Sequence, residues 1–405
     1  MRSILFAFVL TSCFASGQVL NNKNTLPDIG VVGADTLSID EELAIGQVIY
    51  SQLRGQGGVL YDPVVQEYIQ ALGNKLVIHA DNTKYPFTFF VINNQALNAF
   101  AFYGGHVGTH TGLIYRAETE SELASVLAHE IAHVTQRHIV RRSQAAERSS
   151  PLQIASLIGG AILMMASPQA GIAAISAGNA GAIQNQINYT RTFEKEADRI
   201  GLRILSEAGF NPFSAADFFG RLLESKRWSS QAPAFLQTHP LSLNRVAEAR
   251  NRAENMPKVQ NISSEMFRLV KARIQARYFY TAKHNISDFT QRLKAHHNIN
   301  KNAPDSHLVY GLAIALMRDN QFNQALSLLQ QLHRDDNENL AYIDALADVY
   351  IALNKFENAN DLLKPLAQKQ PNNAIVTLNY ANVHPFKRPA KQENKCEDND
   401  QDHHW

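Results

Sequence analysis

Two histidines and a glutamate occur at a spacing that can hold and use a metal ion. They form the segment His129-Glu130-Ile131-Ala132-His133. On a helix, residues four apart lie on one face, one turn apart, so both imidazoles can bind the same ion. Glu130 lies beside them and is positioned to take a proton from a water molecule on that ion. The spacing predicts a zinc-dependent hydrolase; the alternative is a structural pair of histidines.

A third protein ligand is needed, because a catalytic zinc ion takes three and keeps one position open. In the extended motif H-E-x-x-H-x-x-G-x-x-H the third ligand is a histidine. That motif would place glycine at position 136 and histidine at 139, but the chain has Gln136 and Ile139. His138 is one residue short, and we interpret it as a helix-surface histidine. Glu194 and Asp198, four apart, share a face of a second helix. One can bind the metal while the other holds a ligand histidine by its second nitrogen.

Helical periodicity surrounds both groups. Thr119 and Glu122 form a capping-box pattern, and apolar residues follow at spacings of three and four as far as Val134. The second helix is expected from about Arg191 to Ala208, because a glycine and a proline follow it. Glu196 is expected to face solvent, since helix residues two apart do not share a face.

The flanking segments predict an α+β fold, in which a mainly helical zincin metallopeptidase domain contains a small β-sheet. Helical spacing marks residues 37–53 and 63–79, and short strands are expected at 87–92 and 98–102. Residues 151–187 are apolar but interrupted by glycine and proline. This favours a flap or surface hairpin over a membrane span, which stays as the alternative.

The last third of the chain repeats with a period of 34 residues, shown by the pairs Leu312-Ala313, Leu346-Ala347 and Tyr380-Ala381. This period predicts an α-helical tetratricopeptide solenoid behind the catalytic domain. Residues 265–293 are expected to add a degenerate first helical pair. The array stops near Val383 after one helix of a pair, which would leave an apolar face uncovered.

The first residues have the pattern of a removable export signal, with Arg2, an apolar run to Phe14 and small residues before Gly17. This predicts a periplasmic protein; the alternative is an ordinary N-terminal core helix. A lipoprotein-like box ending at Cys13 leaves lipidation and association with the outer membrane open. Cys13 and Cys396 are the two cysteines, so removal of the signal excludes an intrachain disulfide.

The length of 405 residues and hydrophobic content of 45% leave room for two or three domains. A net charge of +1 gives no field that would steer the chain to nucleic acid. The expected organisation is a signal peptide at 1–17, a zinc metallopeptidase domain at 18–255, tetratricopeptide repeats at 256–383 and a disordered tail at 384–405.

Four motifs together resemble a known family. They are H-E-I-A-H at 129–133, E-K-E-A-D-R-I-G at 194–201, N-A-F-A-F-Y-G-G at 98–105 and T-H-P-L-S-L-N-R at 238–245. This set is similar to the gluzincin metallopeptidases, which include the heat-shock protease HtpX and the CAAX prenyl endopeptidases. The resemblance implies one Zn²⁺ per chain, bound by His129, His133 and Glu194. It also implies that Glu130 is the general base and Asp198 the supporting carboxylate.

The resemblance extends to residues around the metal. It implies that His239 is a loop histidine able to reach the metal; the alternative is an ordinary surface histidine. Arg245 is a candidate for stabilising the oxyanion of a bound substrate. An edge strand is implied to pair with extended substrate, and its residues are Asn98, Ala99, Phe100, Ala101 and Phe102.

The expected function is proteolysis of unfolded or stalled envelope proteins. The resemblance implies misfolded outer-membrane proteins as substrates and the beta-barrel assembly machinery as a partner bound through the repeats. Peripheral membrane contact is compatible with it, and nucleic acid is not an expected partner. The alternative is a chaperone-like adaptor whose proteolysis is latent.

Overall fold

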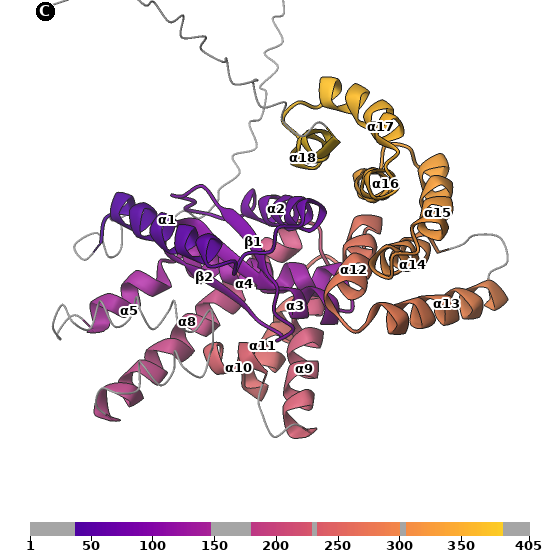
Figure 1. The fold of residues 1–405 in the computed structure, drawn as a ribbon. Helices are drawn as coiled ribbons and strands as arrows, with labels where there is room; N and C mark the ends of the chain where they lie inside the picture. The colour runs from indigo at the N-terminus through magenta and orange to yellow at the C-terminus, as the bar shows by residue number, and fades with distance from the viewer. Residues whose placement is uncertain (1–36, 147–179, 229–232, 300–304, 384–405) are drawn as a thin grey trace, which may run out of the picture.

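The computed structural model describes residues 37–146, 180–228, 233–299 and 305–383 (Figure 1). The predicted signal peptide with Cys13, the apolar stretch as far as residue 179 and the tail after Val383 lie outside the described residues. Within the described ranges, no helix is both long and apolar enough to cross a bilayer.

The first part of the chain is mostly helical around a small sheet, which confirms the predicted fold class. Its elements are α1 (Ile39–Gly55), α2 (Pro63–Val77), β1 (Thr88–Ile92), β2 (Ala99–Phe102), a 3₁₀ turn η1 (Tyr103–Gly105), β3 (His106–His110), α3 (Thr111–Arg116), α4 (Glu120–Thr135), α5 (His138–Ala146), α8 (Ala180–Glu207), α9 (Phe213–Trp228), α10 (Ala234–Thr238) and α11 (Leu243–Glu254). The helix that carries Glu194 therefore begins earlier than the sequence pattern indicates.

The sheet has the order β1-β3-β2. β1 runs parallel to β3, and β2 runs antiparallel to it, with Phe100 opposite Gly108. A side chain at Gly108 would clash with the Phe100 ring, since a Cβ atom there would lie 2.4 Å from it. β2 is thus an edge strand among the described residues, as the resemblance implies. The central strand β3 has no counterpart among the predicted strands.

α4 is buried on nearly all sides. It packs against β2, α2, α8 and α9, and its apolar side chains from Leu123 to Ile131 have at most 1% of their surface exposed. Its N-terminus is capped by Thr119, whose hydroxyl accepts from the Glu122 backbone N–H at 3.3 Å. The Glu122 carboxylate accepts instead from the backbone N–H of Glu118 and from Arg221, so the predicted capping box is only half formed.

The repeats follow as α12 (Glu265–Tyr278), α13 (Ala282–Ile299), α14 (Ser306–Arg318), α15 (Phe322–Asp335), α16 (Leu340–Ala352), α17 (Phe356–Lys369) and α18 (Ala374–Val383). In Figure 1 they form an arc whose inner side faces α2. α18 packs against α16, α17 and α2. The catalytic domain therefore covers part of the face that the sequence pattern left uncovered.

A buried ion cluster joins the repeats to α2. Nε of Arg273 in α12 lies 2.8 Å from the carboxylate of Asp62, the N-cap residue of α2. The same guanidinium lies 2.7 Å from Asp344 of α16 and donates to the Tyr310 hydroxyl at 2.8 Å. Arg273 is 1% exposed. Burial raises the pKa of Asp62, but Arg273 and Arg277 together hold it below its usual value.

The apolar core is also continuous across the predicted domain boundary at residues 255 and 256. One cluster of buried side chains runs from α2 and α4 into α12, α14 and α16. Since both the core and the Arg273 cluster are shared, the repeats and the catalytic domain form one packed body in the described part of the chain.

Replacing Arg273 by Met should lower the free energy of unfolding by about 3–5 kcal/mol, because the buried Asp344 loses its ion pair and Asp62 keeps only the longer one with Arg277, at 3.5 Å. Denaturant unfolding of the purified chain measures this. Arg250→Met is the matched control, because Arg250 forms an exposed pair with Asp217 at 2.9 Å and should change stability by less than about 1 kcal/mol. A loss at Arg273 no larger than that of the control would contradict the shared-core interpretation.

Candidate metal centre

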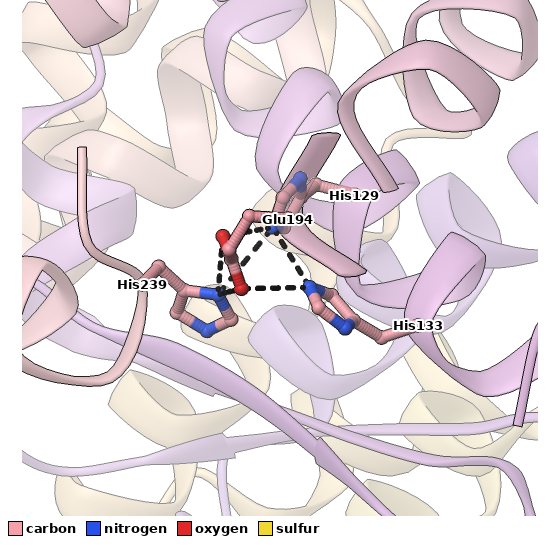
Figure 2. A group of neighbouring side chains, drawn as sticks. All are labelled: His129, His133, Glu194 and His239. Atoms are coloured by element: carbon pink, nitrogen blue, oxygen red, sulfur yellow. Dashed lines mark hydrogen bonds and ion pairs between the residues drawn. The ribbon is translucent and has the colours of Figure 1, made fainter. Parts of the chain in front are cut away.

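The candidate site forms where α4 and α8 cross. α4 supplies His129, Glu130 and His133, while α8 supplies Glu194. His239 follows directly after α10 and reaches the same point (Figure 2). These elements bring together residues that are up to 110 positions apart in the chain.

Small residues let the two helices approach closely. A Cβ atom at Gly201 of α8 would lie 3.0 Å from the backbone of His129. Ala128, Ala132 and Ala197 are fully buried beside it. On α8, Glu194, Ala197 and Gly201 fall on one helical face, because they are three and four residues apart. The face that makes the close contact therefore also presents the carboxylate.

Four side chains converge with donor atoms that all lie within 4.8 Å of one another: His129, His133, Glu194 and His239. Nε2 of His129 lies 3.0 Å from Nε2 of His133 and 3.3 Å from a Glu194 oxygen. Nδ1 of His239 lies 3.1 Å from Glu194 and 3.4 Å from His129 Nε2. Ligands about 2.0–2.1 Å from a tetrahedral zinc ion lie about 3.3 Å apart. The distances that involve His129 or Glu194 are close to this value, so the group has the donor atoms of a zinc site and much of its spacing.

Charge and burial act differently on the members of this group. Glu194 is 2% exposed; burial raises its pKa, but His239, His129 and His133 hold that pKa well below the usual value. Burial lowers the pKa of His133 to about 4, against the opposing effect of Glu194. Burial also lowers the pKa of His129, but Asp198 and Glu194 hold it at about 10. A metal ion binds neutral imidazole, so its binding would release the proton of His129.

Asp198 and Arg245 lie behind the ligands. An Asp198 oxygen is 3.1 Å from Nδ1 of His129, the position of a carboxylate that orients a ligand histidine. Nε and Nη2 of Arg245 donate to Asp198 at 2.6 and 2.7 Å. Nη1 lies 2.9 Å from Glu194 and donates to the Pro240 carbonyl at 2.6 Å. All the side-chain nitrogens of Arg245 are engaged and it is 4% exposed, so in this structure it supports Asp198 and Glu194, and its contact with substrate stays a prediction.

His239 contacts the candidate base as well as the ligands. Its Nε2 lies 3.4 Å from Oε1 of Glu130, which is 1% exposed. Its ring stacks on Phe235 of α10 with centroids 4.6 Å apart, and its backbone N–H donates to the Phe235 carbonyl at 2.8 Å. The surface-loop alternative for His239 is wrong, because the residue is buried.

His138 and Glu196 differ from the expectation that both face solvent. His138 is 2% exposed, and its Nδ1 lies 2.9 Å from Nδ1 of His133. Its Nε2 lies 3.1 Å from the Glu196 carboxylate, which also accepts from Arg141 at 2.9 Å. A tight turn at Arg137, whose φ is 51°, folds α5 back and places His138 over His133. Helical spacing alone does not predict such a turn.

The predicted substrate strand lies beside this site with a partly occupied edge. Phe100 and Ala101 are half-buried, whereas Ala99 and Phe102 are buried. Asn98 is 2% exposed, and its backbone carbonyl accepts from the His110 N–H at 3.0 Å. The carbonyl of Leu97, just before β2, accepts from the Phe235 N–H at 3.1 Å. α10 therefore lies where an added strand would begin to pair.

Paired helix histidines with a carboxylate from a second helix define the metal centre of a metallopeptidase. The chain belongs to peptidase family M48, whose family model matches residues 63–253. A tetratricopeptide-repeat model matches residues 316–378, which confirms the predicted repeats. The chain is a metalloendopeptidase.

Three bacterial relatives that match most of the chain share one name. The chain is 45% identical to a putative beta-barrel assembly-enhancing protease from Vibrio cholerae over 382 residues, which is 94% of this chain and 78% of the relative. It is 40% identical to the beta-barrel assembly-enhancing protease of Escherichia coli over 379 residues, covering 93% and 77%. For the protein of that name from Yersinia pestis the values are 37% over 390 residues, covering 95% and 79%.

Replacing Gly201 by Val should separate α4 from α8, lower the free energy of unfolding by about 1–3 kcal/mol and weaken metal binding, because its side chain would meet the His129 backbone. Gly220→Val in α9 is the matched control, since nothing lies within 4 Å of a Cβ there, and it should stay within about 0.5 kcal/mol. Chemical unfolding and metal titration of both variants measure the two effects. Equal behaviour of the two would show that the close crossing is not required.

Proposed function

We propose that the chain is a zinc endopeptidase of the periplasm that cleaves unfolded or stalled outer-membrane proteins. The observation that carries the proposal is the convergence of three imidazoles and a carboxylate, whose donor atoms all lie within 4.8 Å of one another, with Glu130 beside them. The names of the relatives and the export pattern at the N-terminus support the compartment and the substrate class.

In this proposal each residue has a separate task. His129, His133 and Glu194 would hold the zinc ion, and Asp198 would keep the His129 ring in place. Bound zinc supplies a Lewis acid that activates water and polarises a peptide carbonyl. Glu130 would accept the proton from the attacking water and pass it to the leaving amine. The free edge of β2 would align the substrate by backbone hydrogen bonds.

Glu130→Gln should keep zinc and lower the rate of cleavage by about 100- to 10,000-fold, because the amide cannot accept the proton. His133→Ala should lose zinc and activity together, because it removes a ligand. Metal analysis and initial rates on one unfolded protein substrate measure both. A Glu130→Gln protein that cleaves at the original rate would exclude this mechanism.

His239 would close the site in the described state. Its Nδ1 lies 3.4 Å from Nε2 of His129 and would be the fourth ligand of a bound zinc ion, and its Nε2 faces Glu130. The segment is anchored on both sides, by the Phe235 hydrogen bond to Leu97 and by the Arg245 hydrogen bond to Pro240. A movement of α10 away from β2 would free the Leu97 carbonyl, the base and the fourth position together. The enzyme would therefore be latent until substrate displaces α10.

His239→Ala should raise the initial rate of cleavage, by about tenfold if the closed state is favoured by about 1.4 kcal/mol. Zinc should remain bound through the other three ligands. Comparison of initial rates at equal zinc content measures the effect. A lower rate at unchanged zinc content would make His239 a catalytic helper that stabilises the transition state. It would exclude the proposal that His239 keeps the enzyme latent.

The repeats give a second candidate function, that of a chaperone-like adaptor for the beta-barrel assembly machinery. A cavity of about 500 Å³ opens between α12, α14 and α16, with Tyr278, Met317 and Ile351 in its wall. Such a surface suits a partner segment with apolar side chains. The Glu130→Gln variant separates the two functions, because an adaptor would keep its effect on assembly without cleavage.

A further inference from the structure

His138 lies against a candidate ligand without belonging to the donor group. Its Nδ1 is 2.9 Å from Nδ1 of His133, the nitrogen that points away from the metal position. Its Nε2 is 3.1 Å from the Glu196 carboxylate. Three side chains from α4, α5 and α8 therefore form one chain of contacts that ends at the candidate metal.

The surroundings of this chain of contacts hold it in one geometry. Arg137 makes the turn between α4 and α5, and its Nε donates to the buried carboxylate of Glu42 at 2.8 Å. The His138 ring stacks on Phe193 of α8 with centroids 4.6 Å apart. Arg141 donates at 2.9 Å to the same Glu196 oxygen that His138 contacts, so a second donor holds that oxygen in place.

The hydrogen positions follow from the donors and acceptors. Nε2 of His133 lies 3.3 Å from Glu194, inside the donor group, and must present its lone pair to a metal. Nδ1 of His133 therefore carries the proton and donates it to Nδ1 of His138. His138 then carries its own proton on Nε2 and donates to Glu196, which accepts only. This is the one arrangement of neutral rings in which the His133–His138 and His138–Glu196 contacts each have a donor and an acceptor.

We propose that His138 and Glu196 are positioning residues of the metal centre, which fix the tautomer and the ring orientation of His133. The inference rests on the proposed zinc site. Asp198 has the equivalent contact with His129, so each of the two helix histidines has its own support. Carboxylates and carbonyls that hold a ligand histidine by its second nitrogen affect metal affinity by about 10- to 100-fold. In this chain a second imidazole stands between the carboxylate and the ligand.

The test is zinc affinity of the full chain, measured by competition with a chromophoric chelator. His138→Leu removes the acceptor for His133 and should weaken zinc binding by about 10- to 100-fold. His138→Asn places an amide oxygen near the position of Nδ1, so it should recover most of that loss. Glu196→Gln keeps an acceptor but removes the charge and should fall between the wild type and His138→Leu.

Glu207→Gln is the matched control, because it makes the same change on α8 in an exposed pair with Arg203. It should leave zinc affinity unchanged. Thermal unfolding of each metal-free variant gives the structural comparison. The proposal is supported if zinc affinity falls in His138→Leu and recovers in His138→Asn while the two metal-free variants have similar thermal stability. If His138→Leu does not fold, the Asn and Glu196→Gln variants still decide it.

Two results overturn the inference and have different meanings. A wild-type chain that binds no zinc removes the proposed zinc site, and the positioning role with it. If the wild-type chain binds zinc, and the His138→Leu and Glu196→Gln variants bind it with the same affinity, only the positioning role is excluded. Equal losses for His138→Leu and His138→Asn, in step with lower metal-free stability, would show a packing role and also overturn the proposal.

Discussion

The close crossing of α4 and α8 is the constraint on which the rest of the site depends. Packed helices usually keep their axes 8–10 Å apart, according to the side chains at the contact. Here Gly201 faces the backbone of His129, and alanines fill the positions one turn away. A single carboxylate on α8 can therefore reach two imidazoles on α4. The ligand set depends on residues that do no chemistry themselves.

Charge balance explains why these groups tolerate burial. Glu130, Glu194 and Asp198 are three carboxylates in one buried region, and Arg245 is the guanidinium that pairs with two of them. Burial of unpaired charge costs several kcal/mol, so the remaining carboxylates need a cationic partner. Burial lowers the pKa of His129, but Asp198 and Glu194 hold it at about 10, so an imidazolium supplies part of that balance. A bound divalent cation would replace this proton. Arg245 also ties the loop after His239 to α8, because the same side chain donates to the Pro240 carbonyl and to Asp198.

The sequence predicts the parts of this molecule that follow from regular periodicity. The spacing of His129 and His133, the pairing of Glu194 with Asp198 and the 34-residue repeat are all of this kind, and the predicted helices of the repeats are confirmed. β3 was missed because His106–His110 contains two histidines and a glycine and lacks the alternation of a typical strand. His138 was placed on the surface because a left-handed turn at Arg137 breaks the helical projection. The Asp62–Arg273 pair joins residues 211 positions apart, and no local pattern reveals such a contact.

The hydrogen bond from the Phe235 N–H to the Leu97 carbonyl would affect which proteins the proposed enzyme cleaves. A chain that enters the site must offer an unpaired backbone N–H to replace the one that α10 withdraws. A closed barrel has no unpaired strand edges, whereas an unfinished one exposes them. Cleavage would then depend more on how long a substrate protein exposes unpaired strand edges than on its side chains. In the proposed mechanism the Phe235–Leu97 hydrogen bond would favour cleavage of substrates that assemble slowly, and rapid barrel assembly would protect a substrate from cleavage.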